Sequence, residues 1–138
     1  MKRIKLQNQI DDKTCTSACI AMILHRPVNE VIEDFHDKFM ADEVRASAYL
    51  RSQRIRTRAC LSEDRDLTWG FVYLLAVPSI NKEAGLHSVV VDMRDEDNPK
   101  VFDPQEGRDG RKYYKWKDDP DPDGIALKGF TIDAEVIL

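Results

Sequence analysis

Apolar and polar residues in the first part of the chain alternate with the period of an α-helix. Residues 14–25 place apolar side chains on nearly every side, which predicts a helix buried all round. We expect it to end at Arg26, because a residue that precedes a proline is disfavoured in the helical region. Residues 29–39 and 41–53 carry apolar residues three and four positions apart, with charged residues between them. These segments predict two short amphipathic helices packed beside the buried one.

From residue 55 onward the pattern changes to the two-residue period of a β-strand. Alternation over 55–61 predicts a half-exposed strand, and the apolar run 71–77 predicts a buried one. Further strands are predicted over 86–93, 100–103 and 131–138, the last with its even-numbered apolar residues on one side. Helices first and strands after, joined by turns, predict an α+β fold with an antiparallel sheet.

A polar stretch over 104–124 interrupts this pattern and is too long for a simple connection in a small domain. We interpret it as a surface loop that flanks the functional cleft. Its basic and aromatic run 112–117 could bind an anion or stack a nucleic-acid base. The aspartates that follow within 118–123 would repel phosphate, which favours the loop interpretation.

Length and composition are those of one ordinary globular domain that covers residues 1–138. The chain is 42% hydrophobic and 33% charged, which excludes disorder and fibrous repeats. Its 21 basic and 25 acidic residues leave a formal net charge of -4, so no overall positive field attracts nucleic acid. Nucleic acid is therefore not an expected partner.

The sequence contains no apolar run that approaches the roughly 20 residues of a membrane span. The start of the chain is basic but turns polar at once, so it lacks the apolar stretch of a secretion signal. We therefore expect a cytoplasmic protein that has no membrane partner.

Three cysteines, Cys15, Cys19 and Cys60, cannot all pair with one another, so at least one thiol is free. Cys15 lies at the predicted start of the buried helix, where unpaired backbone N–H groups and the helix dipole favour a thiolate. That position suits a nucleophile, although a cysteine at a helix end is more often a small buried residue. Cys19, one turn further on, is expected in the core together with Cys60.

Three other residues would complete a thiol-dependent active site. Gln9, six residues before Cys15, could direct its side-chain amide at an oxyanion that the Cys15 backbone N–H also contacts. His87 begins a predicted strand, and Asp103 ends the next one, which the intervening turn folds back beside the first. A nucleophile, a base and an acidic group that orients the base form a catalytic triad.

Other residues fit these roles less well. Gln7 precedes the first cysteine by eight residues rather than six, and Asp92 is expected on the opposite sheet face from the candidate histidine. Cys19 and His25 have the spacing of metal ligands but lack further ligands, so no metal and no other cofactor is expected. His25 and His36 are expected to be solvated.

Three segments around the candidate residues resemble the papain-like cysteine peptidases, in particular the group that removes bacteriocin leaders after a double glycine. These segments are 9–23, 86–91 and 101–104, and the resemblance covers about residues 7–104. The resemblance implies a papain-like fold and assigns four roles. They are the oxyanion donor for Gln9, the nucleophile for Cys15, the general base for His87 and the group that orients it for Asp103.

The resemblance implies a hydrolase that cleaves a peptide or amide bond in a protein or peptide substrate. In that family a glycine directly follows the nucleophile, whereas this chain has Thr16, which could narrow the cleft or change the substrate. Its free-standing members include bacterial, phage and effector proteins, and this chain is similar to those. Two alternatives stay open. The same triad could serve a deamidase, a transglutaminase-like enzyme or an isopeptide or peptidoglycan hydrolase, and the fold could also be an inactive binding module.

Overall fold

The computed structural model describes residues 2–58, 66–118 and 120–138. Helices come first along the chain and strands afterwards, which confirms the predicted α+β class. The helical elements are α1 (Cys15–Leu24), α2 (Val28–Val31), the π-helical turn η1 (Ile32–His36), α3 (Asp37–Met40) and α4 (Ala46–Ser52). The strands are β1 (Arg56–Arg58), β2 (Val72–Pro78), β3 (Leu86–Asp92), β4 (Lys100–Phe102), β5 (Tyr113–Lys115), β6 (Gly124–Ala126) and β7 (Thr131–Ile137).

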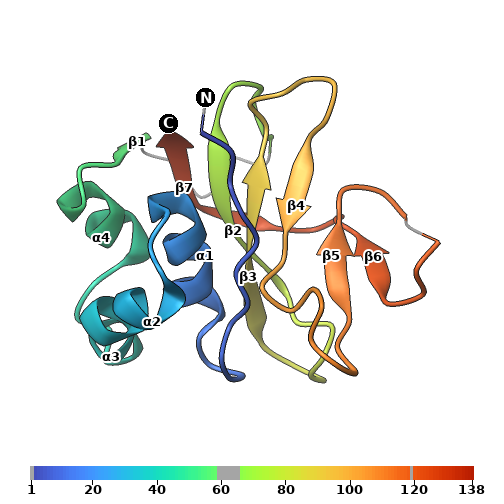
Figure 1. Cartoon of the computed structure of the whole chain (residues 1–138), viewed down its shortest axis with the longest axis horizontal. Helices are drawn as coiled ribbons and strands as arrows, with labels where there is room; N and C mark the ends of the chain where they lie inside the picture. The colour runs from blue at the N-terminus through green and yellow to red at the C-terminus, as the bar shows by residue number, and fades with distance from the viewer. Residues whose placement is uncertain (1, 59–65, 119) are drawn as a thin grey trace.

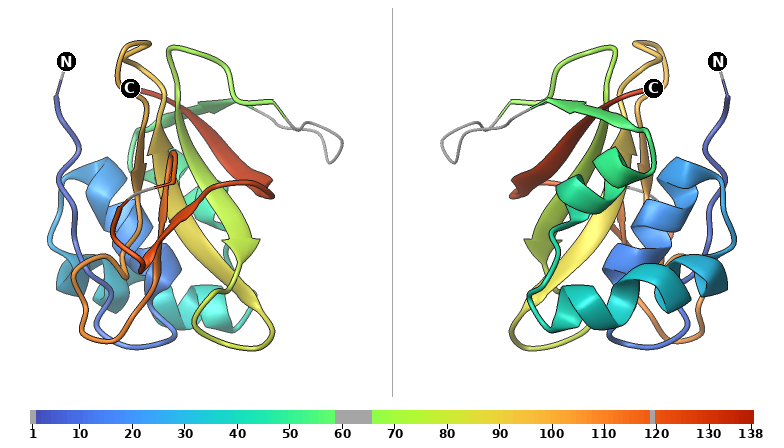
Figure 2. Two further views of the ribbon diagram at one scale, coloured as in Figure 1. Left: turned by 90° about the vertical axis from the view of Figure 1, so that its right-hand side faces the viewer. Right: turned by 90° about the vertical axis from the view of Figure 1, so that its left-hand side faces the viewer.

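The main sheet has five strands in the order β1-β7-β2-β3-β4, and every neighbouring pair is antiparallel, as predicted. β5 and β6 form a separate parallel pair. The helices cover one face of the main sheet (Figure 1). Figure 2 shows the molecule from its two sides, with β5 and β6 toward the viewer in one view and the helices in the other.

α1 is buried along nearly its whole length, as its apolar pattern predicts. All residues from Thr16 to Ile23 are buried, and the helix packs between β3 and the other helices. It ends at Leu24 because His25 adopts a left-handed conformation, with a φ of 55°, and its N–H bonds to the carbonyl of Ala21. None of the helices among the described residues, α1 included, is both long enough and apolar enough to cross a membrane.

The second predicted helix is present but is not one regular α-helix. α2, η1 and α3 follow one another without a break from residue 28 to 40, with the π-helical turn in the middle, and they bury Phe35. The third helix, predicted over 41–53, is confined to α4. Residues 41–45 lie outside it because they begin with a turn in which Asp42 has a φ of 60°.

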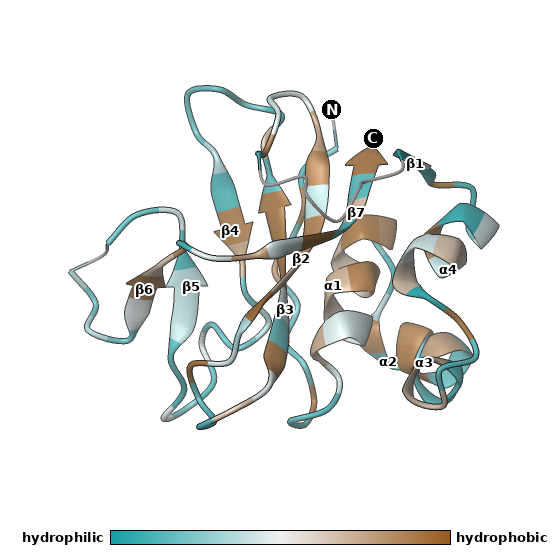
Figure 3. Ribbon diagram, turned by 180° about the vertical axis from the view of Figure 1, so that it is seen from behind, coloured by the Kyte–Doolittle hydropathy of each residue, from teal (hydrophilic) through white to brown (hydrophobic). Residues whose placement is uncertain are grey.

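The main sheet separates two hydrophobic cores, and its central strands β2 and β3 contribute residues to both. Figure 3 shows hydrophobic residues along these strands. Successive residues of β2 and β3 alternate between these cores, because side chains of a strand point to opposite faces. The core on the helix side includes Ile20, Phe35, Leu50, Leu74 and Val90. The core on the side of β5 includes Tyr73, Leu75, Val89, Val91 and Tyr114.

The polar stretch over 104–124 is more than a surface loop, which corrects the interpretation from sequence. It contains β5 and leads into β6, and both Tyr113 and Tyr114 are buried. Tyr114 packs in the second core, and its hydroxyl donates to the carbonyl of Pro78 at 2.5 Å. Alternation of apolar and polar residues could not reveal so short a strand in a highly charged segment.

β7 departs from its prediction in the placement of its first apolar residue. Ile132 packs against the second core, whereas Ala134 and Val136 lie in the first, because the pairing of β7 with β2 contains a β-bulge. The expectation that these side chains share one face is therefore wrong at Ile132. The strand predicted over 55–61 is present as β1, and its last three positions, Cys60 among them, lie outside the described residues.

Candidate catalytic site

Cys15 is the first residue of α1 and is half-buried. The loop before it is held by Thr14, whose hydroxyl accepts hydrogen bonds from the N–H groups of Ile10 and Asp11 at 3.1 and 3.3 Å. The first N–H groups of a helix have no acceptor within the helix, and the helix dipole adds positive potential there. The thiol therefore lies where a negative charge is favoured.

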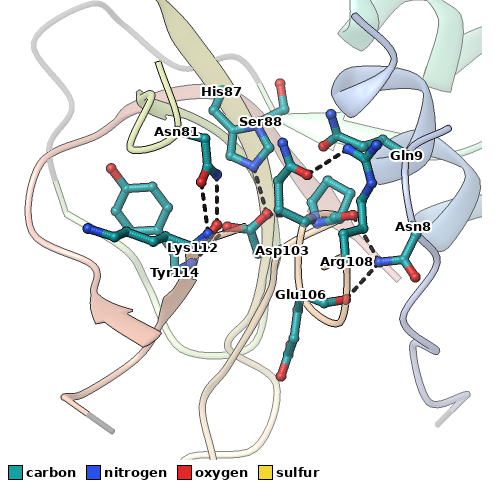
Figure 4. Close-up of polar contacts among 12 residues, drawn as sticks. Asn8, Gln9, Asn81, His87, Ser88, Asp103, Glu106, Arg108, Lys112 and Tyr114 are labelled. Carbon is teal, nitrogen blue, oxygen red and sulfur yellow. Dashed lines mark hydrogen bonds and ion pairs between the residues drawn. The ribbon is translucent and has the colours of Figure 1, made fainter. Parts of the chain in front are cut away.

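His87 and Asp103 form a buried, hydrogen-bonded pair (Figure 4). His87 Nε2 lies 2.6 Å from Asp103 Oδ1, and Asp103 is 0% exposed. The carboxylate also accepts the backbone N–H groups of Gln105 at 2.9 Å and of Tyr114 at 2.7 Å. With three donors on its two oxygens, Asp103 is fixed in orientation and its charge is compensated. The Tyr114 N–H comes from β5, which the sequence did not predict.

Because Nε2 of His87 is bonded to Asp103, Nδ1 is the ring nitrogen left to interact with Cys15. Burial lowers the pKa of His87, but Asp103 and Cys15 outweigh burial and raise that pKa to about 9. Burial raises the pKa of Cys15, but His87, the Ser88 backbone N–H and the Thr16 hydroxyl bring it below the usual 9.0. The two groups titrate as a pair that favours a thiolate beside an imidazolium.

Gln9 is buried on the segment that precedes α1. Its backbone N–H donates to the carbonyl of Pro104 at 3.2 Å, which places it beside the turn that carries Asp103. Its side-chain Nε2 donates to the carbonyl of Asp11 at 2.8 Å, which uses one of the two amide N–H bonds. Among the described residues Gln9 Oε1 has no partner, although it is buried. The second N–H of this amide can donate to a ligand oxygen, as the predicted role requires.

Asn8 reinforces this arrangement, and the sequence did not single it out. Its side-chain Nδ2 donates to the carbonyls of Pro104 at 3.0 Å and Glu106 at 2.7 Å (Figure 4). The segment before α1 and the turn after β4 are therefore fixed to each other over a sequence separation of 96 residues. No pattern in the sequence distinguishes this asparagine from one in an ordinary turn.

Three loops meet at the end of the molecule where α1 begins (Figure 1). Asp12 in the loop before α1 pairs with Arg111 at 3.2 Å, and its carbonyl accepts a hydrogen bond from Lys82 at 3.5 Å. The side chain of Asn81 exchanges two hydrogen bonds of 2.8 Å with the backbone of Lys112. The loop before α1, the loop between β2 and β3, and the segment before β5 thus form a connected rim.

Thr16 connects α1 to β3 directly beside Cys15 and His87, the candidate catalytic pair. Its Oγ1 lies 2.9 Å from Ser88 Oγ, across a sequence separation of 72 residues. Both side chains are buried. Thr16 follows Cys15, and Ser88 follows His87, so the contact lies one residue from each member of the pair. The Thr16 hydroxyl is therefore engaged with the sheet and is not turned to solvent.

The competing residues from the sequence lie in other contacts. Gln7 Nε2 donates to the carbonyl of Arg26 at 2.7 Å, and Gln7 Oε1 accepts the N–H of Val28 at 3.0 Å. This glutamine therefore joins the N-terminal segment to the far end of α1. Both carboxylate oxygens of Asp92 accept hydrogen bonds from Arg94, at 2.9 and 2.8 Å. The roles of these residues are structural.

Cys19 is fully buried one turn after Cys15, as predicted. Burial above all, helped by nearby negative charges, raises the pKa of Cys19 well above 9.0, so that it remains a neutral thiol. His25 lies at the opposite end of α1, and like His36 it is half-buried, where the sequence predicted solvated side chains. Across residues 2–58, 66–118 and 120–138, no three His, Cys, Asp or Glu side chains are grouped as metal ligands.

Comparison with known proteins finds no protein family, no curated protein and no solved structure that matches this chain. The functional inference therefore rests on the residues of the site and their geometry.

Proposed function

We propose that the protein is a cysteine-dependent hydrolase with a papain-like arrangement, and that its substrate is a peptide or protein. The observation that carries this proposal is the contact of three side chains from separate elements. His87 bonds to Asp103 at 2.6 Å, and His87 and Cys15 lie close enough for each to shift the pKa of the other toward the charged form. A buried ionisable pair costs desolvation energy, and a group with a strongly shifted pKa beside a nucleophile is typical of catalytic sites.

In the proposed reaction the Cys15 thiolate attacks the carbonyl carbon of the scissile bond. A C–S bond forms, and the π electrons of the carbonyl move to its oxygen to give a tetrahedral oxyanion. The Cys15 backbone N–H and the second N–H of the Gln9 amide donate to that oxygen. His87 then gives its Nδ1 proton to the leaving nitrogen as the C–N bond breaks.

Water completes the cycle by attacking the carbonyl carbon of the thioester. His87, now neutral, accepts the proton of this water at Nδ1, and the C–S bond breaks to return the thiolate. Asp103 keeps the proton on Nε2 of His87, so Nδ1 is the atom that exchanges protons in both steps. One water is consumed, and an acid and an amine are released.

The proposal is tested by adding the wild-type protein or Cys15→Ala to a cell lysate and identifying new chain ends by mass spectrometry. Chain ends that appear only with the wild type support a peptidase. Conversion of glutamine side chains to acids without new chain ends would identify a deamidase that uses the same triad. The absence of any difference between the two proteins refutes hydrolysis of protein substrates.

Thiol labelling provides a second test that needs no substrate. Iodoacetamide should label Cys15 below neutral pH faster than it labels Cys19 or Cys60, because His87 lowers the pKa of Cys15, whereas burial raises that of Cys19. His87→Ala should remove this advantage, and Cys19→Ala serves as the matched control that keeps it. Equal labelling of all three cysteines at the rate of an ordinary thiol would contradict the proposal.

A further inference from the structure

We propose that the Arg108 guanidinium binds a carboxylate of the substrate next to the scissile bond. The inference rests on the proposed function, because it names the class of peptide that this site favours, which is an acidic one. Two sources can supply the carboxylate: the side chain of an aspartate or glutamate, or the free C-terminus of the substrate. Both present the same group to the arginine.

Arg108 lies in the tight turn that follows Asp103. The Arg108 N–H donates to the carbonyl of Gln105 at 3.1 Å, which closes the turn. Gly107, directly before the arginine, has a φ of 89°, a conformation that favours glycine and lets the chain reverse. In Figure 4 the Arg108 side chain extends from this turn toward Gln9. The turn thus directs the arginine into the candidate site.

Hydrogen bonds connect the guanidinium to the groups of the proposed reaction. Arg108 Nη1 donates to Gln105 Oε1 at 2.7 Å, and the Gln105 backbone N–H donates to Asp103 Oδ1 at 2.9 Å. The segment that carries Gln9 is fixed to the same turn, since the Gln9 N–H donates to the carbonyl of Pro104 at 3.2 Å. Arg108 is therefore connected both to the acidic member of the triad and to the segment of the oxyanion donor.

The charge of Arg108 is not balanced within the described residues. Four arginines among these residues are half-buried, and three of them form an ion pair with a carboxylate. The three are Arg26, Arg94 and Arg111. In the part of the chain that the structure describes, the Arg108 guanidinium is bonded only to the neutral amide of Gln105. A partly buried charge without a counterion is unfavourable, so this position suits an anion that arrives with the substrate.

The acidic side chains around the turn are engaged elsewhere or exposed. Both oxygens of Asp103 are occupied, by His87 and by backbone N–H groups. Glu106 pairs with Lys115 at 2.6 Å, and Asp109 is exposed. A guanidinium has five N–H donors in a planar fork, and two parallel bonds to one carboxylate are its strongest arrangement. A peptide substrate is the source of carboxylates that the proposed reaction itself brings to the site.

Arg108 takes no part in breaking bonds in this scheme, so it is a specificity residue. The carboxylate it binds is present before and during the reaction, and its loss should therefore act on KM more than on kcat. A hydrogen bond to a charged group at a partly exposed position corresponds to about tenfold in binding.

The test uses peptides from a chymotryptic digest of a cell lysate in two forms: a native library, and a library whose carboxylates are converted to methylamides. Mass spectrometry measures each cleavage at peptide concentrations well below saturation, where rates report kcat/KM. The wild type should cleave the native library about tenfold faster than the amidated one. Cleavage at a fixed distance from the C-terminus identifies the terminal carboxylate, and cleavage at a fixed distance from aspartate or glutamate identifies the side chain.

Variants of the arginine test the assignment to this residue. Arg108→Ala should abolish the difference between the two libraries, and a synthetic peptide of one cleaved sequence then separates KM from kcat. Arg108→Glu should invert the preference toward peptides with lysine or arginine at the same position, which a merely structural role would not do. Arg56→Ala is the matched control, because this exposed arginine lies on β1 at the opposite edge of the main sheet from β4. It should keep the wild-type preference.

Thermal unfolding identifies any variant that does not fold, and Arg108→Gln, which is uncharged but still a donor, then replaces it. Equal cleavage of the two libraries by the wild type overturns the role of Arg108 and leaves the proposed function standing, as does a folded Arg108→Ala that keeps the preference. Cleavage of neither library by the wild type, or equal cleavage by Cys15→Ala, refutes the proposed function and this inference with it.

Discussion

In a protein that lacks the Cys15 thiol, replacing Asp103 by asparagine should reverse the direction in which the site shifts the pKa of His87. In the wild type that pKa is about 9, compared with a usual value of 6.5. The difference corresponds to about 3 kcal/mol, at about 1.4 kcal/mol for each pKa unit. Burial acts against the charged form, so this free energy is supplied entirely by Asp103 and Cys15.

The thiol has to be removed for this test because Cys15 also raises the pKa of His87. In Cys15→Ala the pKa of His87 should stay above 6.5, because Asp103 still accepts the Nε2 proton at 2.6 Å. When Asp103→Asn is added, only burial remains, and the pKa of His87 should fall below 6.5. Asparagine keeps one acceptor oxygen and has an NH2 group in place of the other, so the variant removes one acceptor of a backbone N–H together with the charge.

Nuclear magnetic resonance of the histidine ring protons measures this pKa directly in both variants. The chain has three histidines, and a His87→Ala spectrum identifies the resonance of His87. The reasoning is refuted if the pKa of His87 in the double variant stays within a few tenths of a unit of its value in Cys15→Ala. The charge of Asp103 would then play no part in holding the imidazolium.

The stabilities of Cys15→Ala and of the double variant with Asp103→Asn should depend on pH in opposite directions. In Cys15→Ala, His87 has a raised pKa in the folded state, so its stabilisation is fully present below pH 6.5 and is lost as the pH rises through that folded value. In the double variant the folded pKa is depressed, so stability falls as the pH drops below 6.5. Urea unfolding at several pH values measures both slopes, and equal slopes would contradict the prediction.

Three further predictions concern the oxyanion donor, the clamp beside it and the core. Gln9→Ala should slow hydrolysis of an identified substrate by about 100-fold and leave iodoacetamide labelling of Cys15 unchanged; a parallel loss of both would mean that Gln9 supports the thiol and not the oxyanion. Asn8→Ala should lower the free energy of unfolding by about 1–3 kcal/mol in urea, because it removes the bonds to Pro104 and Glu106. Ile20→Ala should cost about 2–5 kcal/mol in the same assay, since Ile20 is fully buried, and a smaller cost would show that the helix-side core can relax around the cavity.

The elements that the sequence predicted well are those whose side-chain pattern is long enough to show a period. α1 extends over ten nearly all-buried residues, and β2 and β3 are apolar runs of seven. β5 was missed because it has only three residues and follows a charged loop. Its burial depends on the packing of Tyr114 in the second core, which no local pattern shows. The π-helical turn and the bulge in β7 also escape prediction, since they depend on how each element meets its neighbours.

The candidate site divides in a similar way. Chain order and spacing singled out Gln9, Cys15, His87 and Asp103, and the structure places these residues together. It also revealed supporting groups with no signal in the sequence, because a backbone N–H or a common polar side chain acquires a role only through its position. They are the N–H of Tyr114, the side chain of Asn8 and the hydroxyl pair of Thr16 and Ser88.

The sequence by itself determined the α+β class, the burial of α1 and a short set of residues able to carry thiol chemistry, because periodicity and residue type are local properties of the chain. The tertiary structure alone decided the contacts of these residues and of their competitors: Asp103 meets His87 at 2.6 Å, whereas Asp92 bonds to Arg94 and Gln7 bonds to the far end of α1. It also decided that the pKa of Cys15 is lowered, because His87 lies beside the thiol only in the folded chain. These outcomes depend on distances and burial between segments far apart in sequence, which only packing brings into contact.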